Sequence, residues 1–115
     1  MSTEIKADGR ENGGSYPKNA PLVQVFGASG KVKIISALLS EHDRDLNVSD
    51  IADIGDVARS TVYENIDDLC EMGVVVKTRE VAGGPMYQIN TENEMVEHIR
   101  EVRDLGLERL LELEK

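Results

Sequence analysis

Residues 49–63 read SDIADIGDVARSTVY, and this stretch decides the fold. Ser49 is a favourable N-cap residue, and Asp50 follows in the first turn, where the helix dipole favours an acid. Gly55 interrupts the helical pattern, so the helix that begins near Ser49 is short. A second helix is predicted over about residues 58–72. The stretch therefore predicts two short helices joined by a tight turn.

The second helix has one apolar face and one exposed face. The apolar positions follow a helical period: Val62, Ile66, Leu69 and Cys70. Ala52 is small where the two helices would cross, and Val57 is the apolar residue that fills the turn. The outer positions are Arg59, Ser60, Thr61, Tyr63 and Glu64, with Thr61 turned partly inward. Two helices packed in this way form a helix-turn-helix.

A β-hairpin is predicted directly after the second helix. Gly73 ends that helix, and residues 74–76 are three valines, a β-branched run typical of a strand. Residues 83–84 are two glycines and mark a turn, and residues 86–89 (MYQI) form the returning strand.

Other segments complete the domain. The apolar run at residues 22–26 is expected to pack against it, and a helix is expected from Ser29 or Gly30 to about His42. The buried face of that helix is predicted at Val32, Ile35, Leu38 and Leu39. Residues 91–94 (TENE) match a capping box and predict a last helix that reaches about Glu114.

The stretch IADIGDVARSTVY, followed by Ile66, Leu69 and the run GVV, resembles the winged-helix regulators of the MarR, ArsR, PadR and TrmB kinds. The resemblance covers residues 48–90 and implies an α+β fold. This fold is a winged helix-turn-helix, with a three-helix core and a β-hairpin wing, followed by a C-terminal dimerisation helix. Such proteins often carry glycine directly before the apolar residue of the turn. Here Asp56 has that place and Gly55 precedes it, so we expect a slightly different turn.

The resemblance implies a sequence-specific DNA-binding transcription regulator, with residues 58–72 in the major groove and the wing, about residues 74–90, on the backbone. The implied base-reading residues are Arg59, Ser60, Thr61 and Tyr63. The implied wing residues are Lys77, Arg79, Gly83 and Gly84. Alternation along the strand is expected to put both basic side chains on one face, opposite Val76 and Thr78. Structural alternatives are local capping by Thr61, packing of Tyr63 on the hairpin and ordinary solvation of the wing.

The sequence predicts three segments: an N-terminal arm (1–21), a winged domain (22–90) and a last helix (91–115). The arm shows no periodicity and is expected to be disordered, either as a plain terminus or as an arm that reaches DNA. The last helix is expected to form a homodimer, because an apolar face at a chain end must be buried. The predicted dimer residues are Met95, Ile99, Val102, Gly106, Leu110 and Leu113. The alternative is packing against its own domain.

The net charge of −9 opposes phosphate binding, which depends on lysine and arginine. One explanation is an acidic protein-interaction module that binds no DNA. The other is a high-salt cytoplasm, where a Debye length of about 3 Å screens distant acids. Scarce aromatics and abundant carboxylates resemble proteins of halophilic archaea, so we favour such an archaeon, or one of its viruses, as the source. Cations at the protein–DNA interface would then offset the repulsion.

No enzymatic motif is recognised. His42 and His98 are isolated, Cys70 is the single cysteine, and residues 27–31 (GASGK) lack the spacing of a phosphate loop. We therefore expect no catalysis, cofactor or metal, although a redox role for Cys70 stays open. No segment has the composition of a signal peptide or a membrane span, so a cytoplasmic protein is expected.

Overall fold

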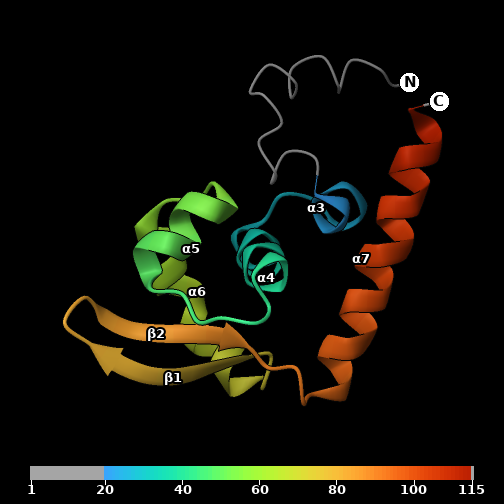
Figure 1. Ribbon diagram of the computed structural model, residues 1–115. Helices are drawn as coiled ribbons and strands as arrows, with labels where there is room; N and C mark the ends of the chain where they lie inside the picture. Colours follow the sequence, from blue (N-terminus) through green and yellow to red (C-terminus); the bar gives the residue numbers. More distant parts are fainter. Residues whose placement is uncertain (1–19, 115) are drawn as a thin grey trace.

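The computed structural model describes residues 20–114, and most of the expected arm, residues 1–19, lies outside this range. The described residues form an α+β winged helix with one antiparallel hairpin and a long final helix (Figure 1). The elements in chain order are α3 (Pro21–Phe26), α4 (Gly30–Ser40), α5 (Val48–Gly55), α6 (Arg59–Glu71), β1 (Val75–Val81), β2 (Gly84–Ile89) and α7 (Glu94–Leu113).

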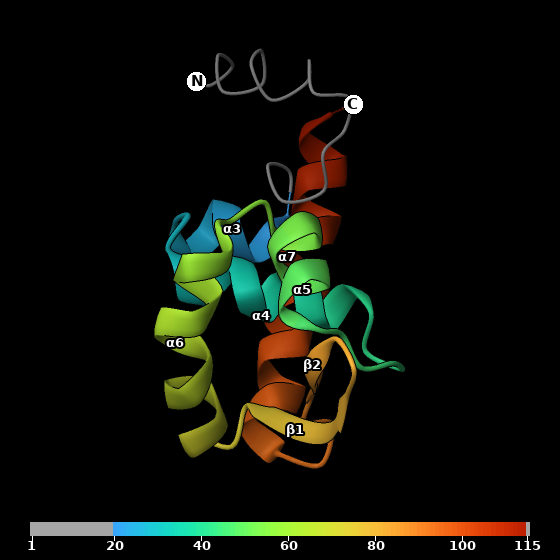
Figure 2. The same ribbon diagram turned by 90° about the vertical axis from the view of Figure 1, so that its left-hand side faces the viewer.

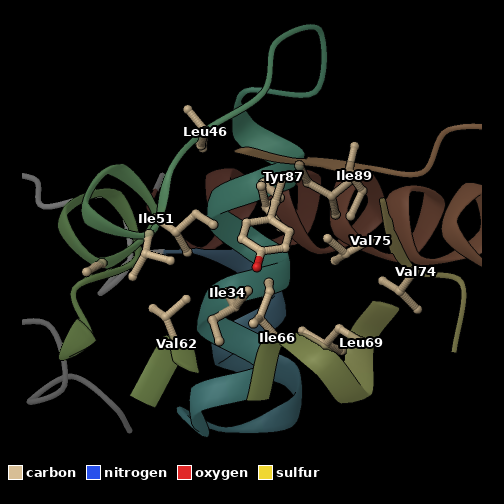
Figure 3. Packing of buried hydrophobic residues seen from close by; sticks show 14 of the residues in the cluster. Ile34, Leu46, Ile51, Val62, Ile66, Leu69, Val74, Val75, Tyr87 and Ile89 are labelled. Carbon is tan, nitrogen blue, oxygen red and sulfur yellow. The ribbon is translucent and has the colours of Figure 1, made fainter. Parts of the chain in front are cut away.

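The core gathers around α4, which lies between the helix-turn-helix and α7 (Figure 1). Figure 3 shows Tyr87 of β2 pointing into this core toward Ile34 and Ile66. The buried face of α4 was predicted only in part. Leu38 and Leu39 are buried as expected, but Val32 and Ile35 are half-buried, whereas Ile34 and Ala37 have no exposed surface. The face is rotated because α3, α5, α6 and β2 all pack against α4.

The first helix of the helix-turn-helix begins earlier than predicted. Asn47, not Ser49, is the N-cap of α5: its Oδ1 accepts from the backbone N–H of Asp50 at 2.8 Å. The carboxylate of Asp50 accepts from the backbone N–H of Asn47 at 3.4 Å, which completes a capping box. Ser49 instead lies in the first turn, because the bridge between Leu46 and Tyr87 holds the chain extended just before Asn47.

The turn of the helix-turn-helix depends on two adjacent residues. Asp56 has a φ of 59°, the left-handed conformation that glycine adopts most easily. Its backbone carbonyl accepts from Lys33 Nζ at 3.2 Å. Gly55 is buried against α4, and a Cβ there would lie 3.1 Å from the carbonyl oxygen of Lys33. The glycine therefore serves close helix packing, while Asp56 provides the left-handed turn.

The wing is a two-stranded sheet with an irregular register. Lys77 is opposite Tyr87, but Arg79 is opposite Met86, so a bulge falls between Lys77 and Arg79. Adjacent residues of β2 point to opposite faces, so the bulge also puts the two basic side chains on opposite faces. The expectation that they share one face was wrong, because simple alternation assumes a regular strand.

The final helix α7 packs against its own chain along part of its length. A Cβ added at Gly106 would lie 3.0 Å from Pro21 Cβ, so the helix that approaches this glycine closely is α3. The N-cap of α7 is Asn93, whose Oδ1 accepts from the backbone N–H of Met95, and the predicted capping box at Thr91 is not formed. Figure 2 shows the C-terminal part of α7 extending past the other labelled helices.

Candidate nucleic-acid interface

The first turn of α6 presents the predicted base-reading residues in different ways. Arg59 and Ser60 are exposed, and Tyr63 is 63% exposed, so it does not pack into the core. Thr61 is half-buried, and its methyl carbon lies close to Gly30 of α4: a Cβ built on Gly30 would be only 2.5 Å from it. The N-cap is Ala58 and has no side-chain bond, so local capping does not explain Thr61. Its methyl group packs toward α4 instead.

A groove of about 290 Å³ joins the start of α6 to the tip of the wing. Its lining residues come from three elements: Asn47, Val48, Ser49, Arg59, Tyr63, Gly83, Gly84 and Pro85. Four of the eight predicted DNA-binding residues therefore lie on one surface. The turn between β1 and β2, whose glycines line the groove, is on the opposite side of the fold from α7 (Figure 1).

Sequence reasoning missed the share of α5 in this groove. Asn47, Ser49 and Pro85 line it, yet none was predicted as a site residue. Asn47 and Ser49 are residue types that favour the start of a helix, and this was the local signal for them at the start of α5. Nothing local could show that the wing tip folds back beside them, because that placement depends on the bridge between Leu46 and Tyr87.

The basic residues do not form one continuous strip. Arg79 donates to both carboxylate oxygens of Asp45, at 2.9 and 3.2 Å, and Thr78 Oγ1 also donates to this carboxylate. The bonds from Arg79 and Thr78 lower the pKa of Asp45 from 3.8 to about 2, and the same pair raises the pKa of Arg79. Lys31 pairs with Asp68 at 3.4 Å. Within residues 20–114, Arg59 and Lys77 form no ion pair.

Acidic side chains follow the reading end of α6. The exposed acids of this helix are Glu64, Asp67, Asp68 and Glu71. They come after the first turn, and Lys31 of α4 contacts one of them. Charge on this helix therefore changes along its length, with Arg59 at the start and carboxylates beyond. An approach to phosphate is favourable only for the N-terminal end.

The six predicted dimer residues lie within one sector of α7, about 80° wide, and the rest of the chain covers part of it. Ile99 packs against the core, Gly106 faces Pro21, and Leu110 is half-buried. Met95, Val102 and Leu113 are exposed and lie seven and eleven residues apart, so they share one stripe of the helix. Other exposed apolar side chains nearby in the fold are Val25 and Phe26 of α3 and Leu105, Leu107 and Leu111 of α7.

The remaining reactive side chains do not gather into a second site. Burial raises the pKa of the Cys70 thiol, and the neighbouring carboxylate of Asp67 adds to this effect. The pKa of His98 is raised by its hydrogen bond with Glu101. No cluster of metal-binding side chains occurs in the described part of the chain. None of the described helices has the length and apolar composition that a membrane span requires.

This geometry defines a class of protein: a winged helix-turn-helix with an exposed reading end beside its wing. Comparison with known families gives the same class. The family model described as bacterial regulatory protein, arsR family, matches residues 28–77, from the segment before α4 into β1. The chain therefore contains a winged helix-turn-helix of the DNA-binding regulator kind, and it is a DNA-binding transcription regulator. No curated protein and no solved structure matches the chain.

Proposed function

We propose that the chain acts as a homodimeric, sequence-specific regulator that inserts the first turn of α6 into the major groove. The observation that carries this proposal is the groove that joins Arg59 and Tyr63 to the wing tip at Gly83 and Gly84. The exposed guanidinium of Arg59 fits a bidentate contact to guanine or a clamp on phosphate. The hydroxyl groups of Ser60 and Tyr63 supply neutral donors beside it.

The wing tip is suited to contact with the sugar–phosphate backbone. Gly84 has a φ of +111°, and a Cβ built there would meet no atom within 4 Å, so the space outside it is open. Gly83 is exposed at the same turn. Two adjacent glycines let a phosphate approach the main-chain N–H groups without a side chain between them.

Few basic residues are available for phosphate contacts. Asp45 occupies Arg79, and Asp68 occupies Lys31, so Arg59 and Lys77 are the unpaired bases nearest to α6 and the wing in the described residues. Counterion release depends on the number of phosphates neutralised, so the loss of DNA affinity with rising salt should be shallow. Cations taken up between DNA and the carboxylates of α6 would make it shallower or invert it. This behaviour suits the high-salt cytoplasm that the composition predicts.

The dimer half of the proposal rests on the apolar surface of α7 and α3. Met95, Val102 and Leu113 form an exposed stripe on α7, and Phe26 of α3 is also exposed. Burying this surface against a second copy removes it from water and relates two reading helices by a two-fold axis. Half-sites about one helical turn apart would follow.

Selection from random DNA tests the proposal directly. The purified chain is incubated with a library of random duplexes about 30 base pairs long, enough for two half-sites. Binding is repeated from about 0.2 to 2 M KCl, which spans strong and weak screening. We expect a two-fold symmetric motif that Arg59→Ala no longer enriches, whereas Arg100→Ala, on the side of α7 away from Met95 and Val102, still enriches it. Failure to enrich any motif at any salt would favour the protein-interaction module.

A further inference from the structure

The end of the reading helix and the start of α7 meet at one carbonyl group. Gly73 directly follows α6 with a φ of +78°, and the backbone N–H groups of Gly73 and Val74 return to carbonyls of its last turn. The carbonyl oxygen of Gly73 accepts two side-chain amides, Asn90 Nδ2 at 2.9 Å and Asn93 Nδ2 at 2.8 Å. In Figure 2 the end of α6 and the start of α7 lie at the same end of the molecule.

Each of these asparagines is fixed at its other end as well. Asn93 Oδ1 accepts from the backbone N–H of Met95 at 2.8 Å, which caps α7. Asn90 Oδ1 accepts from the backbone N–H of Glu92 at 3.1 Å. A carboxamide is planar and rigid, so the Asn93 side chain alone spans from the end of α6 to the first turn of α7.

The far part of α7 is tied to the rest of the chain at separate points. Gly106 lies against Pro21 of α3, and Arg103 Nη1 donates to the carbonyl of Leu39 at 3.5 Å, at the end of α4. The first turn of α7 is anchored by Val96, which is 3% exposed in the core. A tilt at the α3 contact therefore turns α7 about Val96 and reorients its first residues, where Asn93 holds Gly73.

We infer that Asn93, assisted by Asn90, is a positioning residue that couples the orientation of α7 to that of the reading helix. This inference rests on the proposed function, because it takes α6 to be the helix that reads DNA. The coupling gives a partner seated on α7 a physical route to the DNA surface: a shift of α7 moves the Gly73 carbonyl and so the C-terminal end of α6.

The test perturbs the contact between α7 and α3 at Gly106 and measures the response at the end of α6. Gly106→Ala puts a methyl group against Pro21, and the backbone amide chemical shifts of residues 69–75 are recorded by NMR. The same pair of spectra is recorded with Asn93→Asp, which keeps the acceptor that caps α7 but replaces the donor to Gly73 by an oxygen. Thr91→Asp adds the same charge at an exposed neighbour and is the matched control.

We expect Gly106→Ala to shift the amides at the end of α6 in the natural chain and with Thr91→Asp. With Asn93→Asp the shift should fall by about half or more, because one of two donors is lost. Equal shifts in all three backgrounds, or no shift in the natural chain, would overturn the coupling. Asn90→Asp, which keeps its own acceptor for Glu92, gives an independent second variant should Asn93→Asp unfold.

DNA binding separates this inference from the proposed function. On a duplex recovered by selection, Asn93→Asp should weaken binding about 3- to 30-fold, as expected for a coupling residue outside the contact surface. Thr91→Asp should leave the affinity within about twofold of the natural chain. If no duplex is ever recovered but the amide shifts behave as expected, the proposed function fails and the coupling stands. If Asn93→Asp binds like Thr91→Asp, the coupling does not reach the reading surface and the inference is overturned.

Discussion

The guanidinium of Arg79 is held by the carboxylate of Asp45 through two hydrogen bonds, from Nε at 2.9 Å and from Nη2 at 3.2 Å. Arg79 belongs to the wing and Asp45 to the loop before α5, so the pair ties these segments together. Thr78 Oγ1 donates to the same carboxylate. A phosphate could replace this carboxylate as the partner of Arg79, so Asp45 competes with DNA for the one arginine of the wing.

Removing this competitor should strengthen DNA binding. In Asp45→Asn the amide cannot hold Arg79 as an ion pair, and the guanidinium is free to contact phosphate. We expect higher affinity for a selected duplex, and a plot of log affinity against log salt that is steeper by about one unit. Asp43→Asn removes the same charge from the same exposed loop and should change neither quantity as much. Identical effects of the two substitutions would show that only net charge matters.

The same pair gives a signature in acid. The pKa of Asp45 is lowered from 3.8 to about 2 in the folded chain, so the folded state favours its ionised form. The resulting stabilisation is fully present above about pH 4 and is lost as the pH falls toward 2. The difference in unfolding free energy between the natural chain and Asp45→Asn should therefore shrink across this window in urea titrations. A difference independent of pH would mean that the pair does not stabilise the fold.

Close packing between α4 and α6 predicts a destabilised variant with a specific rescue. A Cβ at Gly30 would lie 2.5 Å from the methyl carbon of Thr61, closer than packed atoms tolerate. Gly30→Ala should cost about 1–3 kcal/mol of unfolding free energy, the usual range for overpacking. Thr61→Ser removes that methyl group and keeps the hydroxyl, so the double variant should recover most of the loss. If the losses of unfolding free energy in the two single variants simply add in the double variant, measured by thermal or urea unfolding, the strain does not arise from this contact.

The oligomeric state tests the role of α7. Val102 is 37% exposed on the stripe that it shares with Met95 and Leu113. Val102→Glu should reduce the mass in analytical ultracentrifugation from that of a dimer to that of a monomer, because an unpaired carboxylate is costly to bury. Val81→Glu makes the same change at an exposed valine of the wing and should leave the mass unchanged. A monomeric natural chain would refute the dimer.

The fold was predictable because its signals are local. The amphipathic stripe of α6, the glycine stop at Gly73 and the valine run of β1 all depend on residues close in sequence. The errors arose where distant segments decide. The bridge of Leu46 to Tyr87 moved the cap of α5 to Asn47. The bulge after Lys77 puts the side chains of Lys77 and Arg79 on opposite faces of the wing. The residue types along a strand do not predict where such a bulge occurs.

The sequence predicted which residues belong to the candidate site better than it predicted how they are arranged. Arg59 and Tyr63 were expected on the surface because they lie off the apolar stripe, and both line the groove. The ion pair of Arg79 was not expected, since its partner Asp45 is 34 residues earlier in the chain. A charge count treats every basic residue as available, whereas the fold occupies some of them with carboxylates.

The central claim is that the start of α6 reads DNA, and the affinity of Arg59→Ala for a selected duplex tests it most directly. The affinity is measured by fluorescence anisotropy at fixed high salt, with Arg100→Ala as the control. Arg59→Ala should lose about 1–3 kcal/mol of binding free energy. Its sequence preference should relax at one position of each half-site. Arg100→Ala should bind like the natural chain. Equal affinities of both variants, with the preference intact, would contradict the account.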